Sequence, residues 1–220
     1  MASWKGAIMS NHVVLLGDSI LDNGAYIPGK PAVIDHVRGE LPAGWTATLL
    51  AVDGSYTHDV HNQVRSVPAD ASHLIVSAGG NDALGESGIL ALPAQSAAEV
   101  FAEVARVRER FSRDYRAMLD VVVAQGKPTA ICTVYDGCAD DPLEQQLQVA
   151  GLATFNDVIS REAVRRGLPV IDLRVLFTDP GDYANPIEPS VHGGAKIARA
   201  IADVIGGAAL MASIARHHSS

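Results

Sequence analysis

The feature that most constrains the fold is an alternation of short apolar runs with longer amphipathic stretches. Five runs have the length and the β-branched content of strands buried on both faces. They cover residues 13–16, 46–52, 74–77, 129–134 and 170–173. Strands that alternate with helices build a parallel sheet covered by helices on both faces. The alternation therefore predicts an α/β fold around a five-stranded parallel sheet.

Two long helices are predicted between the later runs. Over residues 100–122, apolar side chains recur at spacings of three and four, with charged side chains on the opposite face. Residues 142–166 repeat this pattern. Gly126 and Gly167 stand where helices commonly end, and a proline follows each of them closely.

Length and composition favour a single domain. The chain has 220 residues, of which 48% are hydrophobic, enough for one sizeable core. We expect one domain over residues 1–220, with its core at about 13–206 and a flexible tail at 207–220. Cys132 lies in an apolar run and is expected to be a buried thiol rather than half of a disulfide.

Several classes of function are disfavoured. A net charge of -8 argues against nucleic acid, whose phosphates need a basic face. No window of about 20 apolar residues spans a membrane, and the N-terminus lacks the apolar core of a secretory signal, so we expect a cytoplasmic protein. Glycine-rich nucleotide-binding motifs are missing, and His58 and His61 have no apparent third ligand. We therefore expect neither nucleotide binding nor a metal site, and the sequence does not reveal the oligomeric state.

Polar residues follow the predicted strands at the edge where parallel sheets bind ligands. The first strand ends in Gly-Asp-Ser with Ser19, and the second is followed by Gly54. The third ends in Gly-Gly-Asn-Asp with Asn81, and His192 precedes the final helical stretch. We expect these four residues to meet at one rim of the sheet.

These residue types suit acyl transfer. A serine hydroxyl needs a base to become nucleophilic, and the imidazole of His192 titrates near neutral pH. The tetrahedral intermediate carries an oxyanion, which needs donors held in place beforehand. The backbone amides of Ser19 and Gly54 and the side-chain amide of Asn81 are the predicted donors. Taken singly, Ser19 also suits a helix cap, and Asn81 suits a simple turn.

The same residues resemble the sequence blocks of the SGNH hydrolases, also called GDSL esterases and lipases. Gly-Asp-Ser at Ser19, the glycine at Gly54, Gly-x-Asn-Asp at Asn81 and the histidine at His192 occur in the family's order, from about residue 13 to 205. The resemblance implies a flavodoxin-like three-layer α/β/α sandwich. It also implies hydrolysis of carboxylic esters or thioesters without a cofactor.

The sequence departs from the family in the last block, which is normally Asp-x-x-His. Pro189 stands three residues before His192, and the nearest carboxylate is Glu188. Glu188 is therefore the first candidate for the acid that orients the imidazole. Asp179, Asp182 or a backbone carbonyl of the same loop are alternatives.

Three functions are compatible with the sequence. The first is a serine ester hydrolase with Ser19 as nucleophile and a small-molecule ester as substrate. The second is an acyltransferase that uses the same acyl-serine. The third is a catalytically weak carbohydrate- or acyl-binding module, which the missing aspartate favours. The modest aromatic content of the predicted loops favours a small or open acyl site.

Overall fold

The computed structural model describes residues 11–217, with side chains described up to residue 207. Its central sheet has five parallel strands in the order β2-β1-β3-β4-β5. The chain moves from β1 to one side and then returns to the other, so the strand order reverses at β1. The strands are β1 (His12–Gly17), β2 (Thr46–Leu49), β3 (His73–Ser77), β4 (Thr129–Cys132) and β5 (Val170–Ile171).

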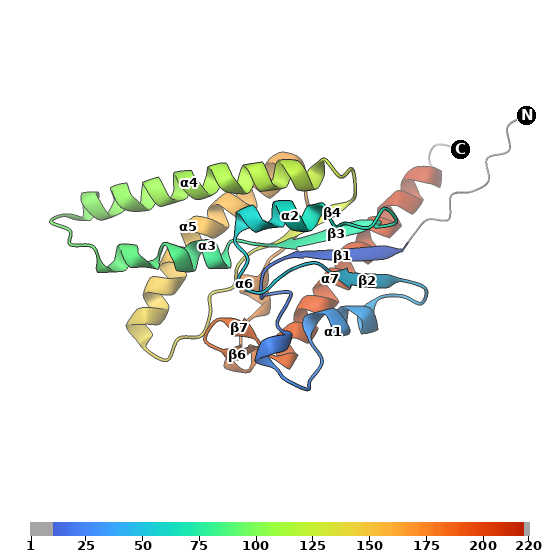
Figure 1. The fold of residues 1–220 in the computed structure, drawn as a ribbon, viewed down its shortest axis with the longest axis horizontal. Coiled ribbons are helices and arrows are strands. Elements are labelled where there is room, and N and C mark those ends of the chain that lie inside the picture. Colours follow the sequence, from blue (N-terminus) through green and yellow to red (C-terminus); the bar gives the residue numbers. More distant parts are fainter. Residues whose placement is uncertain (1–10, 218–220) are drawn as a thin grey trace, which may run out of the picture.

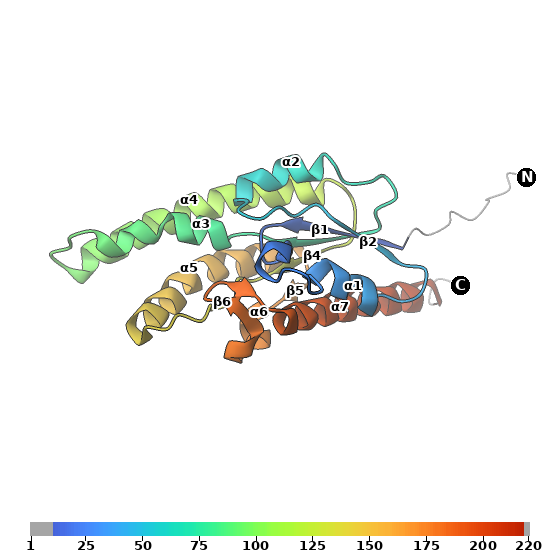
Figure 2. The same cartoon turned by 60° about the horizontal axis from the view of Figure 1, so that its bottom comes forward.

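Helices cover the sheet in two layers, which confirms the predicted α/β/α sandwich. Helix α1 (Val33–Glu40) packs against α7 (Val191–His217) in one layer. In the other layer α4 (Ala97–Val123) packs against α2 (Val60–Val64) and α5 (Pro142–Arg166). Figure 1 shows the first ends of α4 and α5 projecting well beyond the sheet, and Figure 2 shows the same projection after rotation.

Short elements complete the chain between these layers. Two are α-helical, four are 3-10 helices, and two strands form a separate antiparallel hairpin. They are α3 (Gly80–Gly85), α6 (Leu173–Leu176), η1 (Gly24–Tyr26), η2 (Thr57–Asp59), η3 (Ser87–Ala91), η4 (Pro180–Asp182), β6 (Tyr183–Asn185) and β7 (Glu188–Pro189).

Most predicted elements are confirmed with small changes at their ends. Helix α5 has the predicted bounds, because Asp141 accepts a hydrogen bond from the Glu144 amide at its start and Gly167 is left-handed at its end. Strand β2 is shorter than predicted. The amides of Leu50 and Ala51 both donate to the carbonyl of Leu15, so the chain leaves the ladder there.

Two segments contain secondary structure that the sequence did not predict. Residues 174–191, which have no periodic pattern, contain the β6–β7 hairpin, whose strands are too short to leave a signal in the sequence. Helix α7 continues through residues 207–217 of the predicted tail, while residues 218–220 lie outside the described part of the chain.

Two further findings concern Cys132 and the helices that could cross a membrane. Cys132 is a fully buried free thiol at the end of β4, as predicted, and burial raises its pKa to about 12. Between residues 11 and 217, no helix combines the length and the apolar character needed to cross a membrane.

Gly17 fixes the end of the central strand β1. Its φ is +130°, and an added Cβ would lie 1.6 Å from the carbonyl oxygen of Ser77 on β3. The buried Gln63 side chain brackets the same residue, accepting from the Gly17 amide at 2.7 Å and donating to its carbonyl at 2.8 Å. Only glycine fits here, and the residues that follow it start from a rigid point.

We expect Gly17→Ala to cost about 3 kcal/mol or more of unfolding free energy, because β1 and β3 must separate to admit a methyl group. Urea denaturation followed by circular dichroism measures this. Gly39→Ala in α1 is the matched control, since an added Cβ there meets no atom within 4 Å. Equal stability of the two variants would show that the steric argument is wrong.

Candidate active site

The centre of the site is a hydrogen bond between a serine and a carboxylate. Ser19 lies directly after β1, and its hydroxyl donates to Oε1 of Glu188 on β7 at 3.0 Å. Both residues are buried, with exposed fractions of 8% and 4%. The contact therefore joins the end of the first strand to the hairpin before the last helix.

Polar anchors hold Glu188 in this position. The Asn185 side-chain oxygen accepts from the Glu188 amide at 2.9 Å, which closes the hairpin turn. The Tyr135 hydroxyl donates to the carbonyl of the preceding residue at 2.6 Å. The fully buried Asn23 donates to the carbonyl of Pro189 at 3.0 Å. Buried polar groups arranged in this way restrict a carboxylate to one geometry.

His192 lies elsewhere. It is in the first turn of α7, with 68% of its side chain exposed, and its Nε2 is 3.6 Å from Oδ1 of Asp182. Its backbone amide donates to the Ser190 hydroxyl. Among the described residues, the Ser19 hydroxyl bonds to Glu188, and the expected Ser19–His192 pair is not formed.

The third-strand motif is tied to the loop after β2. The Asn81 side-chain amide donates to the Ser55 carbonyl at 2.9 Å, and the Asp82 carboxylate accepts from both the amide and the hydroxyl of Thr57. A carboxamide has two N–H donors, so this bond uses only one of those of Asn81. Gly54 lies in the exposed turn of this loop, at φ +77°, and is outside the set of residues that line the pocket.

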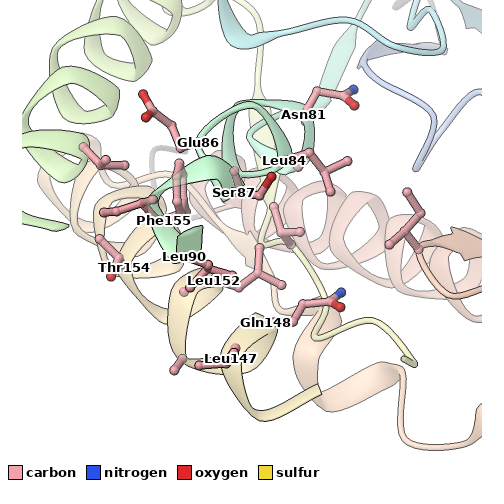
Figure 3. Close-up of a pocket in the computed structure, with 18 of the residues that line it drawn as sticks. Asn81, Leu84, Glu86, Ser87, Leu90, Leu147, Gln148, Leu152, Thr154 and Phe155 are labelled. Carbon is pink, nitrogen blue, oxygen red and sulfur yellow. The ribbon is translucent and has the colours of Figure 1, made fainter. Parts of the chain in front are cut away.

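A pocket of 430 Å³ opens beside the serine. Ser19, Asp18, Asn81 and Glu188 line one end of it. Mostly apolar side chains from α3, η3, α4 and α5 form the remainder, and Figure 3 shows several of them around the cavity. The polar groups that the sequence placed at the strand ends therefore meet at a cavity, with Glu188 in the place expected for His192.

Comparison with known families identifies the chain. The model of the GDSL-like Lipase/Acylhydrolase family matches residues 15–200. The chain belongs to this GDSL-like family. The predicted resemblance is thereby confirmed, and family membership supports ester hydrolysis in general.

Solved structures of lipases, an acylhydrolase among them, share the fold. A lipase/acylhydrolase from Enterococcus faecalis has 19% identity and a TM-score of 0.65, covering 90% of this chain and 96% of its own. An extracellular lipase from Streptomyces rimosus has 18% identity and a TM-score of 0.62, covering 90% and 99%. A phospholipase A1 from Streptomyces albidoflavus has 20% identity and a TM-score of 0.59, with the same coverage. No curated protein matches the chain.

The structure shows how this GDSL-like chain departs from the Asp-x-x-His block. Asn185 and Glu188 have the spacing of that block, and Glu188 contacts the serine. At this spacing the chain has a carboxamide and a carboxylate, whereas the block has an aspartate and a histidine. The predicted position of the block, at His192, lies four residues later, and among the described residues that imidazole makes no hydrogen bond with Ser19. The signal available in the sequence was an asparagine three residues before the only nearby glutamate.

The other candidate acids organise the loop. Asp182 is fully buried, and its Oδ2 accepts from the amides of Thr178 and Asp179 and from Nζ of Lys196 at 2.7 Å. Burial opposes ionisation of Asp182, but the bonds from Lys196 and the amides outweigh it and lower its pKa. Asp179 accepts from the Gly181 amide. These contacts hold the segment before α7 and do not reach the serine.

Two buried acids lie next to each other at the closed end of the pocket. Asp18 is 1% exposed, and its Oδ1 accepts from the Ile20 amide at 3.1 Å. Burial is the main reason that the pKa of Asp18 rises to about 8, and the nearby charge of Glu188 contributes to that rise. Burial also raises the pKa of Glu188 to about 7, against the lowering effect of the Ser19 bond. Near neutral pH, Glu188 therefore exchanges readily between its charged and neutral forms.

Asp18 should make the protein less stable at alkaline pH. At pH values between 3.8, the ordinary pKa of an aspartate, and about 8, the Asp18 carboxyl keeps its proton in the folded state and loses it in the unfolded state. The free energy of unfolding therefore falls as pH rises through this interval. We expect Asp18→Asn, which cannot ionise, to lose less stability than the wild type between about pH 5 and pH 8. Denaturant titrations at both pH values measure the difference, and identical losses in the two proteins would contradict the assignment.

Proposed function

We propose that the chain is a serine ester hydrolase that acts on carboxylic esters through an acyl-serine intermediate. Ser19 is the nucleophile, and Glu188 takes the role that the sequence assigned to His192. The Ser19–Glu188 hydrogen bond, at the closed end of a pocket that Asn81 also lines, carries the proposal. Membership of the GDSL-like family supports ester hydrolysis in general.

In the first half-reaction, Ser19 Oγ attacks the carbonyl carbon of the ester while its proton passes to Oε1 of Glu188. The carbonyl oxygen becomes an oxyanion. The intermediate then collapses, the bond to the alcohol oxygen breaks, and Glu188 returns the proton to the leaving alcohol. An ester between the acyl group and Ser19 remains. A carboxylate suits this work when its pKa is near the working pH, as burial makes that of Glu188.

In the second half-reaction, water attacks the acyl-serine and gives a proton to Glu188. Collapse of the second intermediate breaks the bond to Ser19 Oγ, which regains that proton from Glu188. The products are the free serine and a carboxylic acid, so Glu188 ends in its starting form.

The oxyanion needs donors that are in place before the reaction. The Ser19 amide and the Asn81 carboxamide are the donors we propose, since both residues line the pocket. The Asn81 side chain is held by its bond to Ser55, which fixes the direction of its other N–H. Gly54 stays a sequence prediction, because its turn is exposed and lies outside the pocket lining.

We expect Glu188→Gln to lower kcat on a p-nitrophenyl ester by about 10²–10⁴-fold, because glutamine cannot accept the serine proton. Glutamine keeps the size of the side chain, so the fold should be retained. His192→Ala is the matched control and should leave kcat close to that of the wild type. Ser19→Ala sets the background rate. If His192→Ala is as inactive as Ser19→Ala and Glu188→Gln retains activity, then His192 and not Glu188 is the base.

The pH dependence supplies an independent readout of the same residue. The base must be ionised to accept a proton, so kcat/KM should rise with pH through an apparent pKa of about 7. Residual activity of Glu188→Gln should lack this rise. A wild-type profile that stays flat between about pH 5 and pH 8 would contradict the assignment of Glu188 as base.

One observation favours a second candidate, an acyl-binding module with little turnover. The described part of the chain places no imidazole in hydrogen-bond contact with Ser19. A fluorophosphonate probe separates the two functions, because it reacts with activated serines. We expect labelling at Ser19, shown by mass spectrometry and absent from Ser19→Ala. Silence in the wild type, with labelling gained in the double variant Asn185→Asp and Glu188→His, would support the binding module.

A further inference from the structure

The pocket continues from Ser19 as a groove along the face of α4. Phe101, Val104 and Val107 follow one another at a spacing of three residues and all line it. Phe101 is 72% exposed, Val104 is half-buried and Val107 is 7% exposed. The groove is therefore open at the projecting end of α4 and closed near the sheet.

The opposite walls show the same gradient. On α5, Leu147 is exposed, whereas Leu152 and Phe155 are buried. Leu84 of α3 and Leu90 of η3 are largely exposed and also line the pocket. Figure 3 shows these two leucines and the labelled leucines of α5 around a common space. Exposed apolar side chains that surround a cavity mark a binding site more often than a chance surface.

One end of this groove is the reactive end. Ser19, Asn81 and Glu188 line it where the apolar walls close. An acyl chain in the groove therefore has its carbonyl carbon next to the Ser19 hydroxyl and its tail toward the open end.

We propose that the groove binds the acyl chain of the substrate and selects medium-length acyl esters. That the bound group is an ester rests on the function proposed above. The groove itself is independent of catalysis.

The size of the groove sets the length of the chain. Its α5 wall runs from Glu144 to Phe155, eleven residue steps, or about 17 Å at the rise of an α-helix. An extended acyl chain of roughly 8–12 carbons fits such a length, and 430 Å³ is within the usual range for small-molecule pockets. The modest aromatic content of the predicted loops favoured a small or open acyl site. The groove is open at one end but is not small, because aliphatic side chains provide most of its walls.

Charge at the closed end selects the form of the ligand. Asp18 and Glu188 are both buried there. Asp18, with its pKa raised to about 8, is mostly protonated near neutral pH, and the ionised form of Glu188 repels a fatty-acid anion. A neutral ester enters without this repulsion, and the carboxylate product is expelled by it once it ionises. The groove therefore binds acyl esters in preference to free fatty acids.

Gly151 offers a way to block the groove without disturbing the fold. It lines the pocket from the middle of α5, and an added Cβ there meets no atom within 4 Å. Leucine is also a better helix former than glycine. Gly39→Leu on α1 is the matched control, because Gly39 is equally open and lies outside the pocket lining.

The kinetic experiment compares p-nitrophenyl acetate, hexanoate and decanoate. In the wild type and in Gly39→Leu, kcat/KM should rise with chain length, by up to about fourfold for each fully buried methylene. In Gly151→Leu, kcat/KM for decanoate should fall about tenfold or more relative to that for acetate. A preference for acetate in the wild type, or equal loss on all three esters in Gly151→Leu, would overturn the proposal.

A binding experiment separates this proposal from the proposed function. Ser19→Ala is titrated calorimetrically with decanamide, a neutral ligand that is not an ester, and with acetamide. We expect saturable binding of decanamide alone, lost when Gly151→Leu is added. Binding without any hydrolysis by the wild type would leave the groove assigned and reject the esterase. Hydrolysis of acetate without decanamide binding would reject the groove and leave the esterase.

Discussion

The constraint around which this site is organised is a hydrogen bond from a buried hydroxyl to a buried carboxylate. Burying a carboxylate is costly unless it is protonated or hydrogen-bonded. The Ser19 hydroxyl supplies the bond, and the raised pKa of Glu188 supplies the alternative of protonation. The rigid end of β1 places one partner, and the anchored hairpin places the other. Neither partner would keep its position without the segment that carries it.

The sequence predicted those parts of the molecule that leave local patterns. The five strands, the α5 boundaries and the pocket positions of Ser19 and Asn81 follow from apolar periodicity, helix caps and strand-end motifs. The hairpin and its anchor Asn23 were missed, because they depend on contacts between residues far apart in the chain. His192 was predicted from its residue type and its place between the last strand and the final helix, and neither could show that the chain contacts the serine at Glu188.

The acyl groove illustrates a different limit. Apolar residues at spacings of three and four along residues 100–122 predicted a helix face turned toward the core. The face is continuous in the sequence, yet Val107 lies in the core and Val100 is exposed. Periodicity identifies the face but cannot show where the sheet beneath it ends. Beyond that point the same pattern lines a binding cavity.

Helices α4 and α5, which form two walls of this cavity, pack on the sheet with their later turns and project beyond it with their first turns (Figure 1). Ion pairs from Arg108 to Asp157 and from Arg116 to Glu162 link α4 and α5 closer to the sheet. The outer turns extend past these links and contribute little to the interior on which folding depends. Mutations there are free to lengthen, shorten or widen the acyl channel while the reactive end stays intact. Substrate preference in such a chain can therefore change without a change in the fold that holds the reactive end.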